Sequence, residues 1–116
     1  MDRNVAMILE RCPELESMYL EMVRTSDDDP GAPGLLAEMA DYVTQLLRTD
    51  EAAVFFLGRS FAGVEQVALH SEDAEDLVVW SFFDAFSPDD FRRVEQWLGP
   101  RTRALLDEVE RDVSFR

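Results

Sequence analysis

The fold class is decided by residues 87–106, SPDDFRRVEQWLGPRTRALL, which contain the start of one helix, its end and the start of the next. Ser87 suits the N-cap position and Pro88 the first helical position, and two carboxylates follow in the first turn, where negative charge stabilises a helix. Gly99 is the expected stop of this helix, and Pro100 is the expected start of the last one. Two capped helices with a short connection predict an all-α protein.

A second apolar element precedes this pair. Residues 76–86, DLVVWSFFDAF, are apolar on almost every side and too short to cross a bilayer, which predicts a core helix with Trp80 buried in it. A buried strand is the alternative, because the run is rich in β-branched and aromatic residues. Ser71 is the expected cap of this helix, and the acidic residues after it complement the positive end of a helix dipole.

Two further helices are predicted upstream. Residues 33–48 place leucine, methionine and valine on one face, and the Thr-Asp pair at 49–50 suits the N-cap of the next helix. Residues 54–68 have apolar side chains on nearly all faces, so we expect this helix to be central. Gly58 and Gly63 each weaken such a helix by about 1 kcal/mol relative to alanine, so we expect a neighbouring helix to pack closely there.

The N-terminal region is also predicted to be helical. Between Val5 and Met22 apolar residues recur every three or four positions, and Pro13 is expected to split this segment into two helices. Aspartate, proline and glycine collect at 25–34, which predicts a flexible acidic loop. We therefore expect a single helical domain over residues 1–116, with five to six short helices in an antiparallel bundle or in stacked helical hairpins.

The charge of the chain limits its partners. The net charge is −14, and all eleven basic residues are arginine, a bias typical of a bacterial genome rich in G and C. Such a negative field disfavours nucleic acid and anionic membranes, and it favours a cationic protein partner, whose association it speeds. Solubility alone is the plain alternative. Cys12 is the single cysteine and no apolar run is long enough to span a membrane, so we expect a cytoplasmic protein.

Residues that carry enzyme chemistry are scarce. His70 is the only histidine, so neither a Ser-His-Asp nor a Cys-His site can form without it, and we expect it to cap the end of its helix. The aspartates at 27–29 do not follow the spacing of a calcium loop, and no phosphate-binding or zinc motif is present. One basic neighbourhood is interleaved with acidic residues, which predicts surface ion pairs: Arg92, Arg93, Arg101 and Arg103. We predict no catalytic residue, no metal site and no cofactor.

Acidic residues and a tryptophan are the candidate contacts for a protein partner. Acidic side chains cluster around residues 76–86, and an exposed tryptophan beside them would be a natural anchor. The plain alternative is that both tryptophans belong to the core. The predicted partner-binding residues are Glu72, Asp73, Glu75, Asp76, Asp84, Asp89, Asp90 and Trp97.

Part of the chain resembles a family of small bacterial helical proteins of unknown function. The similar stretch runs from Leu57 to Leu106 and includes VEQVALHSEDAEDLVVWSFFDAF and WLGPRTRALL. In that family a helix ending in an acidic residue is followed by an acid-rich turn, an aliphatic-aromatic helix and a late LGP. The counterparts here are Val64-Glu65, Glu72 to Asp76, Leu77 to Phe86, and Leu98-Gly99-Pro100. Members of this group look like immunity proteins, the small acidic proteins encoded beside secreted toxins.

These observations predict a non-catalytic protein-binding module. The resemblance implies an immunity or antitoxin-type inhibitor, which would occlude a cationic bacterial toxin or effector with its acidic face. A structural or adaptor protein that forms a homo-oligomer, such as a homodimer, through its aromatic helices is the first alternative. An inhibitor that mimics DNA with regularly spaced carboxylates is the second.

Overall fold

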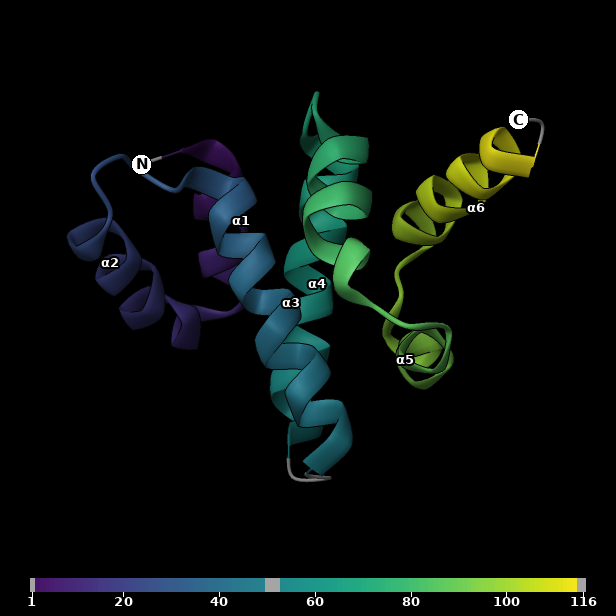
Figure 1. Cartoon of the computed structure of the whole chain (residues 1–116), viewed down its shortest axis with the longest axis horizontal. Helices are drawn as coiled ribbons and strands as arrows, with labels where there is room; N and C mark the ends of the chain where they lie inside the picture. The colour runs from purple at the N-terminus through teal and green to yellow at the C-terminus, as the bar shows by residue number, and fades with distance from the viewer. Residues whose placement is uncertain (1, 50–52, 115–116) are drawn as a thin grey trace.

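The computed structural model describes residues 2–49 and 53–114, which form helices with short connections (Figure 1). No strand occurs within these ranges, so the all-α prediction is confirmed. The elements in chain order are α1 (Arg3–Arg11), η1 (Pro13–Leu15), α2 (Glu16–Thr25), α3 (Gly31–Thr49), α4 (Val54–His70), η3 (Glu75–Phe82), η4 (Phe83–Ala85), α5 (Pro88–Val94), η5 (Glu95–Trp97) and α6 (Pro100–Ser114).

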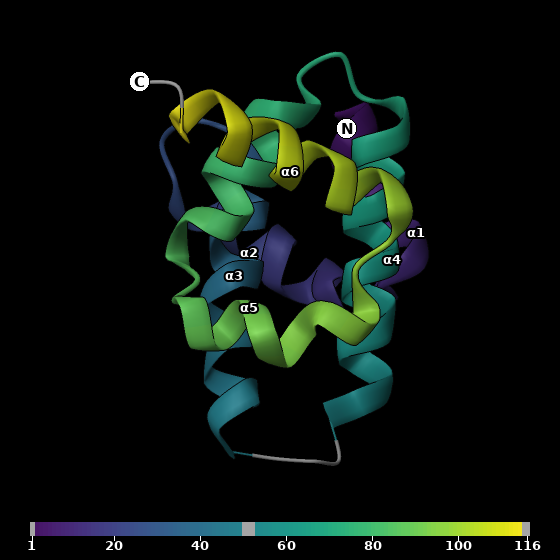
Figure 2. The same cartoon turned by 90° about the vertical axis from the view of Figure 1, so that its right-hand side faces the viewer.

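α3 and α4 run antiparallel through the middle of the fold (Figures 1 and 2), with few close backbone contacts between their described residues. α1 packs against α4, and η3 packs against α3. Large side chains that are fully buried in the core include Ile8, Leu36, Met39, Phe61 and Phe82. The N-terminal helices lie on one side of the hairpin, and α5 and α6 lie on the other (Figure 1). A central helical hairpin with helices on both sides agrees with the predicted architecture.

Pro13 separates the first two helices, as predicted. α1 stops at Arg11, and Cys12 leaves the helix with a φ of −134°. A 3₁₀ turn then starts at Pro13 and leads into α2 at Glu16. Proline lacks the N–H that would continue α1, and its ring suits the first position of the new turn.

The acidic loop is shorter than predicted. α3 begins at Gly31, whose φ is 61°, and not at Pro33. Glycine takes this left-handed conformation without the clash that a β-carbon causes. Asp29 fixes the helix start, because its Oδ1 accepts the Gly31 N–H at 2.9 Å and the Tyr19 hydroxyl at 2.7 Å. The loop therefore covers residues 26–30.

α4 begins later than predicted. The expected N-cap role of Thr49 is wrong, because Thr49 is the last residue of α3. Its hydroxyl donates to the Gln45 carbonyl of the same helix at 3.0 Å. Asp50, the other half of the expected cap, lies outside the described residues. α4 starts at Val54 with Ala53 in the N-cap position and with no side-chain cap bond.

α4 is central, as predicted, and contacts α1, α6, η3 and η5. A β-carbon on Gly63 would lie 3.4 Å from Cα and O of Ile8, so α1 packs directly on the backbone of α4 at this glycine. The prediction of a closely packed helix is wrong at Gly58. There the atom nearest an added β-carbon is Cδ1 of the Trp97 side chain, at 4.0 Å.

The aromatic segment before α5 is a π-helix, so the strand alternative is wrong. The N–H of Phe83 donates to the carbonyl of Val78, five residues back, which is the hydrogen bond of a π-helix. Trp80 is 51% exposed, so the prediction that it belongs to the core is also wrong. The buried side chains of η3 are Leu77, Val78, Val79 and Phe82.

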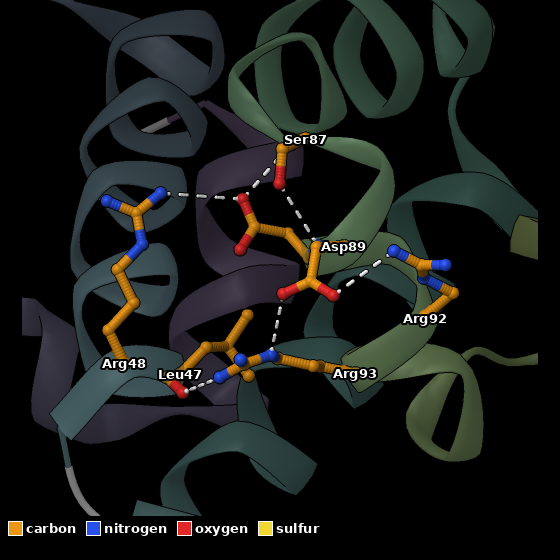
Figure 3. A network of polar contacts seen from close by, with 7 residues as sticks. Leu47, Arg48, Ser87, Asp89, Arg92 and Arg93 are labelled. Atoms are coloured by element: carbon orange, nitrogen blue, oxygen red, sulfur yellow. Dashed lines mark hydrogen bonds and ion pairs between the residues drawn. The ribbon is translucent and has the colours of Figure 1, made fainter.

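The start of α5 is as predicted and is fixed against the end of α3. The Ser87 hydroxyl accepts the Asp90 N–H at 3.1 Å, and the Asp90 carboxylate accepts the Ser87 N–H at 3.0 Å, which is a capping box. Figure 3 shows Arg48 of α3 reaching this cap, at 3.8 Å from the Asp90 carboxylate. Arg93 of α5 donates in return to the Leu47 carbonyl at 2.9 Å.

α6 starts at Pro100, as predicted, and a residue of α4 caps it. The Glu65 carboxylate accepts the N–H and the hydroxyl of Thr102, both at 2.8 Å, and the Arg101 N–H at 3.1 Å. Gly99 does not stop α5 through a left-handed conformation, because its φ is not positive. A β-carbon there would lie 2.3 Å from Cδ of Glu65, so glycine is needed for this close approach.

Candidate interaction groove

An open groove of about 750 Å³ lies between η3, α5 and α6. Its floor is aromatic, since the rings of Phe83, Phe86 and Phe91 have centroids 5.0 to 5.6 Å apart. Figure 2 shows α5 and α6 running on either side of this part of the molecule. The lining residues are Val79, Trp80, Phe83, Asp84, Phe86, Pro88, Phe91, Arg92, Glu95, Leu98, Arg103, Leu106, Asp107, Val109 and Glu110.

Trp80 lies at the edge of this groove among carboxylates. In a helix with hydrogen bonds from i to i+5, residues four and five apart are neighbours on one face. Trp80 therefore shares the exposed face of η3 with Glu75 and Asp76. Asp84, four residues further on, is exposed and lines the same groove. An aromatic ring bordered by carboxylates suits contact with a cationic surface, because the ring offers apolar area and attracts cations to its face.

The acidic residues at the start of η3 have no ion-pair partner in the part of the chain that the structure describes. The chain contains no arginine between Arg59 and Arg92. Four carboxylates at the start of η3 are exposed, and none of them forms an ion pair with another described residue: Glu72, Asp73, Glu75 and Asp76. Ser71 organises this turn, since its hydroxyl accepts the Asp73 N–H at 3.1 Å. The negative charge at this end of η3 is therefore available to a partner.

Three of the predicted partner residues have other contacts. Asp90 is only 3% exposed and its carboxylate belongs to the capping box of α5. Asp89 is exposed but pairs with Arg92 at 3.2 Å and with Arg93 at 3.0 Å. Trp97 is half-buried and stacks on an aromatic ring of α4 at a centroid distance of 6.3 Å. Of the eight predicted partner residues, Asp84 alone lines the groove, and these three have roles in packing and ion pairs.

The arginines near the groove are used in ion pairs, as their interleaving with acidic residues predicts. Besides the two pairs with Asp89, Arg103 lies 3.7 Å from Glu95. Arg101 lies 3.7 Å from Glu108. Because these cations already face carboxylates, they add little positive potential to the rim of the groove.

The single cysteine and the single histidine of the chain lie outside the lining of the groove. The Sγ of Cys12 is buried 3.8 Å from the Ser60 hydroxyl, and burial raises the pKa of the thiol, which keeps it in the poorly nucleophilic protonated form. His70 is exposed at the last position of α4. The hydrogen bond from Arg59 lowers the pKa of the Glu14 carboxyl. Across residues 2–49 and 53–114 no group of three or more histidine, cysteine or acidic side chains is placed to hold a metal ion.

A second apolar surface lies near the tip of the α3–α4 hairpin. Phe55 is 79% exposed, and Val54 and Tyr42 are about half exposed. Phe56 packs edge-on against Tyr42 at a centroid distance of 5.2 Å. A hollow of about 550 Å³ borders this surface. Among the described residues that line this hollow, the one charged residue, Glu14, pairs with Arg59.

Two important residues were missed by sequence reasoning. Trp80 was expected in the core, and the signal against that was its spacing from acidic residues, which stand four and five positions before it and four after it. No structural role was predicted for Glu65 from the sequence. Its partner Thr102 is far along the chain, and no local pattern links the two residues.

No family model, curated protein or solved structure matches this chain. The resemblance of residues 57–106 to a bacterial family therefore stays a prediction. Within the described part of the chain, no helix has the length and apolar character needed to cross a membrane.

Proposed function

We propose that this protein is a non-catalytic protein-binding module that holds a cationic protein partner at Trp80 and the groove beside it. One observation carries the proposal: Trp80 is 51% exposed at the edge of an open aromatic groove, next to Asp84 and the unpaired carboxylates of η3. Tryptophan buries a large area at low entropic cost, and such residues dominate the binding energy of interfaces when they fill a pocket.

The charge distribution defines the class of partner. The whole chain carries −14, and Glu75 and Asp76 lie beside Trp80 without an ion-pair partner among the described residues. A field of this sign raises the association rate of a cationic protein and repels an anionic one. The carboxylates would then set the rate of encounter, while Trp80 and the groove would set the lifetime of the complex.

In particular, we propose that the protein binds a toxin and inhibits it. An immunity or antitoxin-type protein needs no catalytic group, because covering the active or substrate-binding face of a toxin is sufficient. Such a protein must share a compartment with the toxin, for which we propose the cytoplasm, and it must associate quickly. A small acidic domain with an exposed aromatic anchor has these physical properties.

An affinity capture experiment with matched variants tests the proposal. The tagged protein is used to capture partners from a lysate of its own source at low and at high salt, with bound proteins identified by mass spectrometry. The test variant is Glu75→Arg/Asp76→Arg. The control variant, Asp27→Arg/Asp28→Arg, makes the same change in net charge in the exposed loop after α2.

A stoichiometric basic partner supports the proposal if the test variant loses it at low salt and the control variant retains it. Association rates with the purified partner should then fall by about tenfold or more for the test variant alone. Recovery of only untagged copies of the protein itself would contradict the proposal. Equal loss by both variants would show that net charge, and not the η3 surface, holds the partner.

Self-association is the second candidate function. It is favoured by the exposure of Phe55 and Val54 near the tip of the α3–α4 hairpin, because exposed apolar side chains of this size mark contact surfaces when they cluster. Light scattering tests it. A stable dimer that Phe55→Ser converts to a monomer would identify this surface as an oligomer interface.

A further inference from the structure

The walls of the groove limit what kind of backbone can occupy it. η3, α5 and α6 are helices, whose backbone N–H and C=O groups are already hydrogen-bonded within each helix except at the ends. An extended segment would therefore find no strand edge to pair with. A helix brings its backbone hydrogen bonds with it. The groove thus favours a helical occupant over an extended one.

The dimensions of the groove suit the side of a short helix. α6 lines one wall of the groove from Arg103 to Glu110, a stretch of about 12 Å. About two turns of a bound helix span this stretch and can present an apolar stripe along the wall. The aromatic floor of Phe83, Phe86 and Phe91, together with Leu106 and Val109 on α6, offers apolar contact for such a stripe.

The charges of the rim indicate the polar face of the occupant. Asp84 is exposed at the rim and forms no ion pair with another described residue. The arginines of the lining, Arg92 and Arg103, are already paired with Asp89 and Glu95. The rim therefore favours positive charge on the flank of the helix that faces η3.

We propose that the groove receives an amphipathic helix of the partner, with its apolar stripe on the aromatic floor and with lysine or arginine on the flank that faces Asp84, Asp76 and Glu75. This inference rests on the proposed function and names the part of the cationic partner that binds. The helix-in-groove mode uses anchors at positions i, i+3, i+4 and i+7 of the bound helix.

A synthetic peptide tests the inference without knowledge of the partner. The probe is an amphipathic helix of leucine and lysine, about 15 residues long to match α6. Two control peptides are a shuffled sequence of the same composition and a peptide in which alanine replaces leucine. Binding is measured by titration calorimetry, and the site is mapped by NMR shifts in the ¹⁵N-labelled protein, including the indole N–H of Trp80.

We expect the probe to bind more tightly than both control peptides and to shift signals of η3, α5 and α6. Asp84→Arg should weaken it by about tenfold or more, and Asp27→Arg, which makes the same charge change elsewhere, by less than about threefold. Shifts spread over all acidic surfaces, or equal weakening by both substitutions, would overturn the inference. The control peptides need no change in the protein, so their comparison with the probe tests the inference even if Asp84→Arg fails to fold.

The inference and the proposed function can fail separately. If the lysate yields a basic partner that depends on Glu75 and Asp76 while the probe does not bind in the groove, the function stands and the helical occupant is wrong. If the probe binds in the groove while the lysate yields no foreign partner, the ligand class stands and the proposed function is wrong.

Discussion

At the scale of single residues, Glu65 connects two distant helices. Its carboxylate bonds to the start of α6, and Gly99 leaves the space for it. We predict that Gly99→Ala displaces this carboxylate, because the new β-carbon would lie 2.3 Å from Cδ of Glu65. Loss of a helix cap costs about 1 kcal/mol. Urea unfolding followed by circular dichroism should show a loss of that size.

A double-mutant cycle separates this explanation from a general effect at Gly99. In a Glu65→Ala background the cap is already absent, so Gly99→Ala should cost much less than it does in the wild-type protein. Equal costs in both backgrounds would mean that the β-carbon disturbs something other than Glu65. The stability of the two single variants and the double variant decides between these results.

The hydrogen bond between Tyr19 and Asp29 predicts a dependence of stability on pH. The bond to Asp29 raises the pKa of Tyr19 from 10.0 to about 12, and the bond from Tyr19, followed by the Gly31 N–H, lowers the pKa of Asp29 below 3.8. The tyrosine contribution is complete below pH 10 and is lost as pH rises through about 12. The aspartate contribution is complete above its unfolded pKa and is lost as pH falls through its lower folded pKa.

Tyr19→Phe removes this bond and provides the measurement. The free energy of unfolding, taken from urea titrations over a range of pH, should be lower for Tyr19→Phe than for the wild-type protein at neutral pH. The difference should shrink above pH 10 and below pH 4, where one partner changes its protonation state. A difference that stays constant from neutral pH to pH 12 would contradict this assignment.

At the scale of elements, α5 depends on its cap. It has only seven residues, too few to be stable without contacts at its ends. We predict that Ser87→Ala, which removes half of the capping box, lowers the free energy of unfolding by about 1 kcal/mol. Ser17 is an exposed serine within α2 with no cap role. Ser17→Ala should therefore change stability by less than about 0.5 kcal/mol, as measured by the same urea titrations.

Helix starts that depend on local patterns could be predicted from the sequence, and tertiary features could not. The signature at Ser87 and Pro88 predicted α5 because its hydrogen bonds join neighbours in the chain. Pro13 predicted a split for the same reason. The cap of α6 could not be predicted, because Glu65 is 37 positions from Thr102. The start of α3 depends in part on Tyr19, ten residues before Asp29.

The candidate site was predicted in part for a related reason. The acidic residues around η3 were predicted from charge alone; in the structure Asp84 lines the groove, and Glu75 and Asp76 are exposed on η3. The anchor was predicted to be Trp97, but Trp80 is the more exposed tryptophan at the groove. An apolar run is assigned to the core when α-helical spacing is assumed. Residues four apart share a face in an α-helix as well as in a π-helix, so Asp76 and Asp84 indicated an exposed face for Trp80, but its apolar neighbours outweighed that signal.

At the scale of the whole molecule, the N-terminal helices and the candidate groove lie on opposite sides of α3 and α4. The N-terminal helices lie on one side, and α5 and α6 border the groove on the other (Figure 1). Gly63 allows α1 to pack directly on α4. This close packing of α1 on α4 and the candidate groove therefore lie on opposite sides of α3 and α4.

The net charge of −14 also predicts how salt affects stability. The molecule measures 42 × 33 × 21 Å, so at 10 mM salt, where the screening length is about 30 Å, carboxylates repel each other across the fold. At 150 mM the length is about 8 Å, which removes this repulsion but preserves close ion pairs such as Arg93 with Asp89 at 3.0 Å. The melting temperature should rise by roughly 4 °C between these conditions.

A variant in which amides replace four exposed carboxylates should show a smaller rise: Asp27→Asn, Asp28→Asn, Glu72→Gln and Asp73→Asn. A melting temperature that falls with salt would mean that ion pairs outweigh the repulsion.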